Sequence, residues 1–233
     1  IHLLQLVSFR NHNIREFTFI QGLTVIWGEN GSGKTAVLEA IHTLSFGKSF
    51  RTHKQQEMIR NPDESLVIRG HFLSNKHTDK VAVEVKRSSG QKLKLNGNTL
   101  SSRKDLIGRN NVVVLSPEEQ SITKGAPVER RKFFDKMFSM SSHNYVDTLQ
   151  QYSRILKQRN AEILNVKENN QQIKSLQSWD EKLTETGHKL WEIRFNFMNS
   201  FKTNLKSIVG RYDKDIQFEI SYLDNILPLD IYQ

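Results

Sequence analysis

Short extended segments separated by turns dominate the hydrophobic pattern of the first half of the chain. The run Leu23–Trp27 is mostly apolar and rich in β-formers, which is typical of a buried strand. Similar patterns predict six other strands, at Leu3–Phe9, Phe17–Ile20, Leu66–Leu73, Val81–Lys86, Lys92–Leu95 and Val112–Leu115. Turns are expected at Ser88–Gly90 and at Asn96-Gly97. One helix interrupts this pattern, because the apolar spacing from Ala36 to Leu44 predicts a helix that ends near Gly47.

The pattern becomes helical from Pro127 onward, where glycine almost disappears. Two apolar helical faces are expected, one of Phe133, Phe134, Met137 and Phe138, the other of Leu149, Tyr152, Ile155 and Leu156. The polar stretch Asn165–Gln172 predicts a loop or a frayed joint. Apolar steps of three, four and seven from Ile173 to Ile208 then predict one long amphipathic helix that contains Gly187 and stops near Gly210. Phe218, Ile220 and Tyr222 alternate as a strand would.

These elements predict three regions along the chain. Residues 1–116 are expected to form an α/β lobe, residues 117–212 a helical lobe, and residues 213–233 a strand that returns to the first lobe.

Charge and composition narrow the class of protein. The chain has 233 residues, and its 34 Lys and Arg against 25 Asp and Glu give a formal net charge of +9. A positive excess of this size indicates either a polyanionic partner such as nucleic acid or a merely basic surface. The absence of cysteine excludes disulfides and thiolate metal sites. No apolar run approaches the roughly 20 residues of a membrane span, so the chain is expected to be soluble and intracellular.

The strongest chemical motif is the segment Gly28-Glu29-Asn30-Gly31-Ser32-Gly33-Lys34-Thr35, which matches G-x-x-x-x-G-K-[ST] in full. Its glycines allow positive-φ turns that point successive N–H groups at phosphate oxygens. Lys34 is expected to reach the β- and γ-phosphates, and the Thr35 hydroxyl to ligate Mg²⁺. The helix that follows directs its N-terminal N–H groups at the same anions. The segment therefore predicts a site for Mg-ATP, although such loops serve kinases, GTPases and ATPases alike.

Together with its neighbours, the loop resembles the RecF family of bacterial recombinational-repair ATPases. The stretches that carry this resemblance are Ser8–Asn11, Gly28–Thr35 with Val37–Ile41, Gly47–Thr52, Ser116–Glu119 with Lys124–Arg131 and Asp135, and Leu156–Asn160. They occur in the family's order from residue 8 to residue 160.

The resemblance implies a P-loop NTPase with an ABC-type ATPase head, in which an α-helical lobe is inserted into a mixed α/β lobe. It also implies an ATP-dependent homodimer that binds gapped or double-stranded DNA, acts with RecO and RecR in DNA repair and replication, and belongs to the bacterial cytoplasm and nucleoid. A slow DNA-dependent ATPase activity is expected of the complete protein. The family is considerably longer than this sequence, which resembles an N-terminal portion.

Two departures from the family pattern limit what the chain is expected to do. Neither a Leu-Ser-x-Gly-Gln signature nor the acidic strand end of a Walker B motif is found in the sequence. ATP binding without hydrolysis is therefore expected. The glutamine that senses Mg²⁺ and water in such heads has one candidate, Gln120, although the preceding Pro-Glu pair could replace it.

Basic residues outside the loop have two interpretations each. Arg10 and Asn11, at the end of the opening strand, face the nucleotide by resemblance, whereas a strand-end arginine is often simply solvated. Candidates for DNA contact are Arg51, Arg130, Arg131, Lys132, Lys157 and Arg159. Three consecutive cations cannot share one helix face, so at least one of residues 130–132 is expected to be solvated. Asp135, four residues after Arg131, is expected to pair with it.

Two alternative functions stay open from the sequence. One is a binding module that holds ATP as a structural ligand and never turns it over. The other is a P-loop kinase that acts on a small molecule or nucleoside.

Overall fold

The computed structural model describes residues 1–74, 77–115, 126–169 and 174–220. The chain divides into two compact units, and the first ends at Arg130. The sequence pattern put this boundary at Pro117, which lies outside the described residues. Helix α3, Pro127–Ser141, begins close to the observed division.

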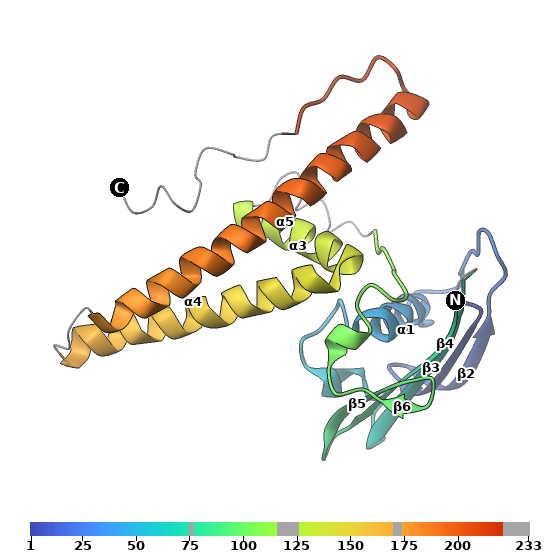
Figure 1. The fold of residues 1–233 in the computed structure, drawn as a ribbon. Helices are drawn as coiled ribbons and strands as arrows, with labels where there is room; N and C mark the ends of the chain where they lie inside the picture. Colours follow the sequence, from blue (N-terminus) through green and yellow to red (C-terminus); the bar gives the residue numbers. More distant parts are fainter. Residues whose placement is uncertain (75–76, 116–125, 170–173, 221–233) are drawn as a thin grey trace. The chain divides into compact units, whose positions relative to one another are not determined.

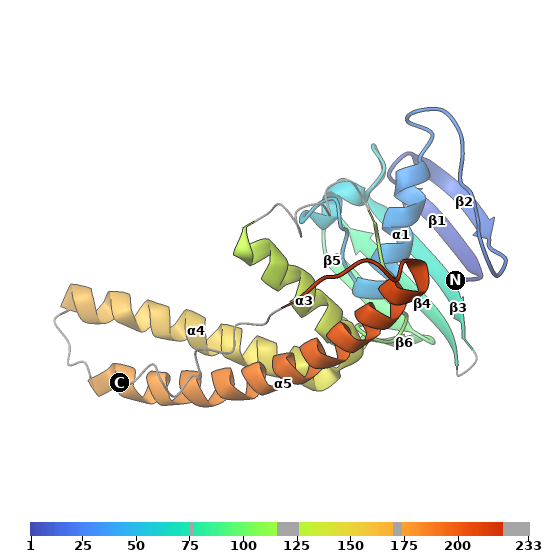
Figure 2. The ribbon, with the colours of Figure 1, turned by 90° about the horizontal axis from the view of Figure 1, so that it is seen from above.

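An antiparallel six-stranded sheet is the framework of the first unit, with the strand order β2-β1-β3-β4-β5-β6 (Figures 1 and 2). The strands are β1 (Leu3–Phe9), β2 (His12–Thr18), β3 (Ser65–Leu73), β4 (Thr78–Lys86), β5 (Gly90–Leu95) and β6 (Asn98–Thr99). Two short 3₁₀ helices, η1 (Gln55–Met58) and η2 (Arg103–Asp105), lie in its connections. The predicted meander of β3, β4 and β5 is thus confirmed, whereas the strand expected at Phe17–Ile20 begins earlier, at His12.

The alternation of buried and more exposed side chains explains why these residues form strands. In β4, Val81, Val83 and Val85 are buried, while the residues between them are partly exposed. The β5–β6 hairpin turns at Asn96-Gly97, where φ is 50° and 89°. Positive φ at both central residues is what the favoured two-residue hairpin turn requires.

Helix α1 (Lys34–Phe46) lies on one face of the sheet and contacts β1, β3 and β4 (Figure 2). Its residues Ala36, Ala40 and Leu44 are buried with the strand residues in a common core. The helix approaches the sheet closely at Gly70, where an added Cβ would lie 2.5 Å from the Leu44 side chain. As predicted, the helix ends at Gly47, whose φ is 64°.

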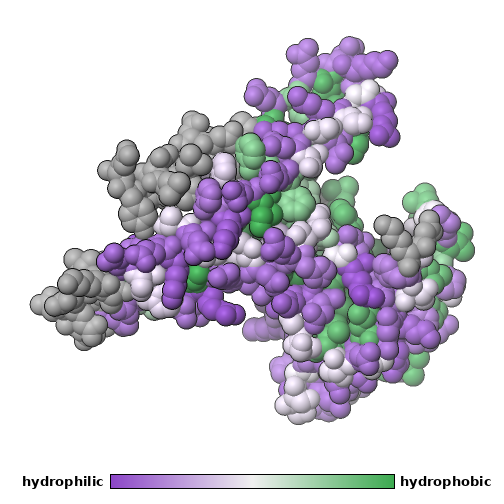
Figure 3. All heavy atoms as spheres, viewed as in Figure 1, coloured by the Kyte–Doolittle hydropathy of each residue, from purple (hydrophilic) through white to green (hydrophobic). Residues whose placement is uncertain are grey.

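The buried strand predicted at Leu23–Trp27 is wrong for the described residues. This segment belongs to no sheet, and most of its side chains are exposed, 88% for Leu23 and 87% for Trp27, whereas Ile26 is partly buried against the core. The strand predicted at Val112–Leu115 is wrong in the same way, since Leu115 is 93% exposed. An apolar run becomes a strand only beside a hydrogen-bonding neighbour, and none of the described strands pairs with either segment. Apolar residues are visible at the surface of this unit in Figure 3.

In its described residues, the second unit contains the helices α3, α4 (His143–Asn169) and α5 (Lys174–Tyr212) (Figure 1). Helices α4 and α5 pack along each other. The core consists of Phe138, Tyr145, Leu190 and Met198, surrounded by partly buried aromatic residues that include Phe134, Phe197 and Phe201. These phenylalanines therefore serve as core, as their helical spacing predicted. The long helix runs through Gly187, as expected, and passes Gly210 to end two residues later.

The segment after α5 does not form the predicted strand within its described part. Residues 213–220 belong to no helix or strand, and Ile220 packs against the aromatic core of the helical unit. Tyr222 and the rest of the predicted strand lie outside the described residues.

Candidate nucleotide-binding site

The eight residues from Gly28 to Thr35 form a compact turn that leads directly into α1. Positive φ at Gly28 (149°), Gly31 (83°) and Gly33 (96°) gives the loop its curvature, and only glycine adopts such angles without strain. Gly33 occupies the N-cap of α1 and provides no capping side chain. The N–H groups of the first helical turn and the positive end of the helix dipole are therefore directed at the loop, as anion binding requires.

The ammonium group of Lys34 lies within the turn. Its Nζ donates hydrogen bonds to the carbonyl oxygens of Gly28, at 2.8 Å, and Glu29, at 2.7 Å. Thr35 follows in the first turn of α1 and is exposed, so its hydroxyl is accessible to a cation. The loop thus combines main-chain donors, one ammonium group and one hydroxyl, a set that suits the phosphate oxygens and Mg²⁺ of a nucleoside triphosphate.

Two neighbouring side chains contact the loop, one from the turn between β1 and β2 and one from the first residue of β2. Asn11 Nδ2 donates to the Gly31 carbonyl at 2.7 Å, and His12 Nε2 lies 3.2 Å from the Gly33 carbonyl. Asn11 was predicted to face the nucleotide, and the structure places its amide on the loop backbone. His12 was missed by the sequence analysis, because a histidine one position after an Arg-Asn pair has no recognisable spacing.

A cleft runs between β2 and the loop. It has a volume of about 690 Å³, which is within the range of small-molecule sites. From β2 it is lined by residues 11–17, and from the loop side by Trp27, Gly28, Gly33 and Lys34. The cleft therefore extends from the predicted phosphate site and has room for the remainder of a nucleotide.

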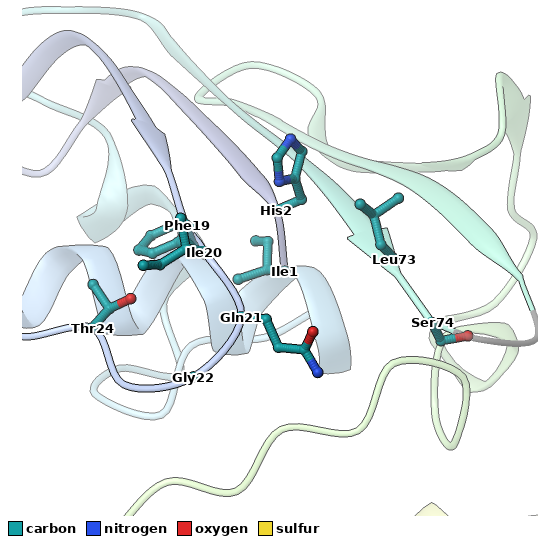
Figure 4. A pocket seen from close by; sticks show the side chains of 9 residues that line it. All are labelled: Ile1, His2, Phe19, Ile20, Gln21, Gly22, Thr24, Leu73 and Ser74. Atoms are coloured by element: carbon teal, nitrogen blue, oxygen red, sulfur yellow. The ribbon is translucent and has the colours of Figure 1, made fainter.

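A second cavity, of about 770 Å³, lies at the opposite end of β1 (Figure 4). Its lining residues are Ile1, His2, Phe19, Ile20, Gln21, Gly22, Thr24, Leu73 and Ser74. None of these nine is a lysine, an arginine or a carboxylate. Such a lining offers no charged partner for a triphosphate, so the cleft beside the loop is the better candidate.

Arg10, which the family resemblance implies faces the nucleotide, contacts protein acceptors in this structure. Its guanidinium makes a two-point ion pair with Glu39, at 2.9 Å from Nε and 2.6 Å from Nη2, and Nη1 donates to the Glu57 carbonyl at 2.7 Å. Arg51 Nη1 lies 3.3 Å from the same carboxylate, and Ser49 Oγ donates to it at 2.5 Å. All three guanidinium nitrogens of Arg10 thus have protein acceptors in this structure. A contact between Arg10 and the nucleotide stays a prediction.

Glu39 is the centre of this cluster, and its side chain is completely buried. Burial alone would raise the pKa of the carboxyl group. The hydrogen bonds from Arg10 and Ser49 and the charges of Arg10 and Arg51 outweigh burial and hold the pKa below its ordinary value. Glu39 is therefore ionised, and it ties the end of β1 and the segment after α1 to the helix that carries the loop.

The predicted DNA-contact residues are spread over both units. Arg130, Arg131 and Lys132 are exposed in the first part of α3, and Lys157 is exposed on α4. Arg159 forms an ion pair with Asp180 that links α4 to α5, so this side chain already has a structural partner. Gln120, the candidate sensor of the attacking water, lies outside the described residues.

Two structural findings bear on metals and membranes. Within residues 1–74, 77–115, 126–169 and 174–220, no group of three or more His, Asp or Glu side chains is arranged to hold a metal ion. Over the same ranges, every helix is too short or too polar to cross a bilayer.

Comparison with known proteins finds relatives over almost the whole chain. The family model described as "AAA domain" matches residues 1–225. The DNA replication and repair protein RecF of Chlorobium limicola is 34% identical over 229 residues, which cover 98% of this chain and 63% of that protein. The protein of the same name from Clostridium acetobutylicum is 37% identical over 226 residues, covering 96% of this chain and 61% of the relative.

A solved structure of the recombination mediator protein RecF with ATP, from the RecFOR pathway, is also similar. It matches with a TM-score of 0.86 at 28% identity, over 99% of this chain and 64% of that one. A second RecF structure matches with a TM-score of 0.84 at 31% identity, over 91% of this chain and 57% of that one. The chain thus spans about three-fifths of the length of the relatives that it matches.

Proposed function

The chain belongs to the AAA domain family, and from the geometry of its loop we propose that it binds the triphosphate of Mg-ATP between Gly28 and Thr35. In this proposal the main-chain N–H groups around Gly31 and Gly33 bind the β- and γ-phosphate oxygens. Lys34 exchanges its two carbonyl partners for phosphate oxygens, and Thr35 ligates Mg²⁺. The observation that carries the proposal is the glycine turn with Lys34 inside it, at the N-terminus of α1.

The biological role proposed for the chain is DNA repair of the RecF type. In the complete protein, ATP promotes a homodimer that binds gapped or double-stranded DNA and assists recombinase loading together with RecO and RecR. Similarity to RecF proteins at 34–37% identity supports this proposal, and so does the net charge of +9. Arg130, Arg131 and Lys132 are the proposed phosphate contacts, because they are adjacent, cationic and exposed.

Binding without turnover is the activity proposed for this sequence alone. Hydrolysis needs a carboxylate near the γ-phosphate to position water, and the sequence contains no recognisable Walker B or signature motif. ATP would then act here as a bound ligand rather than as a substrate.

Isothermal titration of the chain with Mg-ATP tests the proposal. Wild type is expected to bind saturably, and Lys34→Ala to bind about 100-fold more weakly, because the variant loses charge-assisted hydrogen bonds to two phosphates. Lys92→Ala removes an exposed lysine from β5, away from the loop, and should bind as wild type does. Equal affinity of wild type and Lys34→Ala would refute the proposed site.

Phosphate release separates the binding module from the enzyme. Release at the level of a blank, under conditions where binding is saturated, agrees with binding alone. Turnover that disappears in Lys34→Ala would show that the chain hydrolyses ATP after all. Transfer of the γ-phosphate to a small-molecule acceptor would instead support the kinase alternative.

A further inference from the structure

The side chain of His12 lies directly against the glycine loop, although it belongs to the sheet. Its Nε2 is 3.2 Å from the Gly33 carbonyl. A Cβ atom added to Gly33 would lie 2.4 Å from that nitrogen and 2.7 Å from Oδ1 of Asn11. Contacts this short mean that the loop backbone rests on the two side chains, with no space between them.

The imidazole ring is held in place by its surroundings. His12 is 8% exposed, and its ring meets Phe17 edge to face at 6.0 Å between centroids. Both residues belong to β2, which pairs along its length with β1. The donor nitrogen therefore belongs to a strand of the sheet, at the first position of β2.

The hydrogen bond to Gly33 determines where a neighbouring N–H group points. The Gly33 carbonyl also accepts the first bond of α1, from the N–H of Val37 at 3.2 Å, so two donors fix its direction. In a trans peptide unit the C=O and the following N–H point in opposite directions. Fixing the Gly33 carbonyl on His12 and Val37 therefore directs the Lys34 N–H the other way, into the turn.

Asn11 acts in the same manner two peptide units earlier. Its amide binds the Gly31 carbonyl at 2.7 Å. The Ser32 N–H, on the other side of that peptide unit, donates to the Glu29 carbonyl at 3.2 Å. In the nucleotide complex a phosphate oxygen would take the place of this carbonyl as the acceptor.

We propose that His12, assisted by Asn11, is a positioning residue for the triphosphate: it holds the Gly33–Lys34 peptide in the orientation that binds phosphate and does not itself touch the base. This inference rests on the proposed function, since it concerns the same loop. It extends that function by assigning the preorganisation of the loop to β2. The ligand class that benefits is any polyphosphate chain, whatever base it carries.

Two variants isolate the hydrogen bond from the packing of the ring. His12→Phe keeps an aromatic ring against Phe17 and removes the donor. His12→Gln places a side-chain N–H at a reach similar to that of Nε2. His53→Phe, at an exposed histidine outside the loop, is the matched control.

The test measures the affinity of each folded variant for Mg-ATP and for inorganic tripolyphosphate, by competition with a fluorescent ATP analogue. His12→Phe is expected to weaken both ligands by the same factor, about five- to tenfold, which is the contribution of one hydrogen bond. His12→Gln is expected to remain within about twofold of wild type. His53→Phe should match wild type for both ligands.

Three results would overturn the inference while leaving ATP binding intact. A loss for ATP but not for tripolyphosphate would make His12 a contact of the base. Unchanged affinity of His12→Phe for both ligands would show that the His12 ring serves only in packing. Failure of His12→Gln to restore the affinity would show that the hydrogen bond from His12 is not what supports binding.

The remaining outcomes also decide between the two proposals. Wild type that binds neither ligand would refute the proposed function itself. Should His12→Phe not fold, Asn11→Ala replaces it, because Asn11 is exposed and its loss leaves the core unchanged. The same parallel weakening of both ligands is then expected, and unchanged affinity of Asn11→Ala contradicts the inference.

Discussion

The charged carboxylate of Glu39 is completely buried, and it forms ion pairs with two arginines from separate segments. Arg10 arrives from the end of β1 and Arg51 from the segment after α1. Since Glu39 lies on α1 a little more than one turn after Lys34, the cluster holds the helix whose N-terminus forms the phosphate site. Removing one member of a buried ion pair leaves the other charges without compensation.

We expect Glu39→Gln to lower the free energy of unfolding of the first unit by about 2–3 kcal/mol. This loss is smaller than the roughly 3–5 kcal/mol typical of breaking a buried pair, because Arg10 and Arg51 are partly exposed and can regain water. Hydrogen exchange of α1 and β3 peptides, followed by mass spectrometry, measures the change. Glu84→Gln, which removes the surface ion pair with Lys86, is the control and should leave protection unchanged. Equal protection in Glu39→Gln and wild type would contradict the expectation.

Comparison with the same variant also shows how Glu39 makes the stability of the wild-type protein depend on acid pH. The pKa of Glu39 is lowered in the folded protein, so its contribution to stability is complete above the ordinary glutamate value of about 4.3. It is lost as the pH falls through the lower folded pKa, because the unfolded chain then binds the extra proton. The stability of wild type should therefore fall more steeply in acid than that of Glu39→Gln. Parallel curves for the two proteins would show that the group does not titrate as described.

Within the helical unit, a polar cluster links all three helices. Asp135 on α3 accepts hydrogen bonds from Tyr145 on α4 and from Arg194 Nη2 on α5, the latter at 2.7 Å. Arg194 Nε also donates to the Tyr145 hydroxyl at 2.9 Å. Burial raises the pKa of that hydroxyl, which stays protonated as a donor. The prediction that Asp135 pairs with Arg131 is wrong, since its partners come from other helices.

Arg194→Met should lower the thermal midpoint of the helical unit measured by circular dichroism at 222 nm. The variant keeps the aliphatic part of the side chain and leaves Asp135 without its cation, a loss of about 2 kcal/mol. Lys189→Met, which breaks an exposed ion pair with Glu185 on the same helix, provides the comparison. A decrease of similar size in both variants would mean that the cluster contributes no more than a surface pair.

At the scale of elements, some of the strands and helices that the sequence predicted correctly have spatial neighbours that are also their neighbours along the chain. The meander β3–β4–β5 and the α4–α5 pair are of this kind. The predictions at Leu23–Trp27 and Val112–Leu115 are wrong because strand formation needs a partner edge, which an apolar run cannot specify. The pattern records that a segment is hydrophobic, but not what it packs against.

For the molecule as a whole, the net charge of +9 is the property that bears most directly on a DNA partner. Each phosphate that a lysine or arginine neutralises releases counterions, and this makes the binding constant depend on salt. The proposed contacts on α3 should therefore be detected by the salt dependence of the DNA-binding constant rather than by an affinity measured at one salt concentration.

We expect the chain to bind a gapped duplex more weakly as salt rises from about 50 to 200 mM, as measured by fluorescence anisotropy. Replacing Arg130, Arg131 and Lys132 together with glutamine should reduce the slope of log K against log salt by about one to two units. Three consecutive side chains point to different sides of a helix, so at least one of them does not face the DNA. Replacement of Lys80, Lys86 and Lys92 on the sheet removes the same charge and serves as the control. An identical slope for both triple variants would remove α3 from the proposed interface.

The sequence by itself determined the phosphate-binding loop, the helix that follows it, the change from sheet to helices and the family, because each depends on residues that are adjacent or regularly spaced. Only the tertiary structure decided which side chains surround the loop. Glu39 meets Arg10 across 29 positions, and His12 meets Gly33 across 21. Contacts over such separations arise when sheet and helix pack together, so no local pattern of residues contains them.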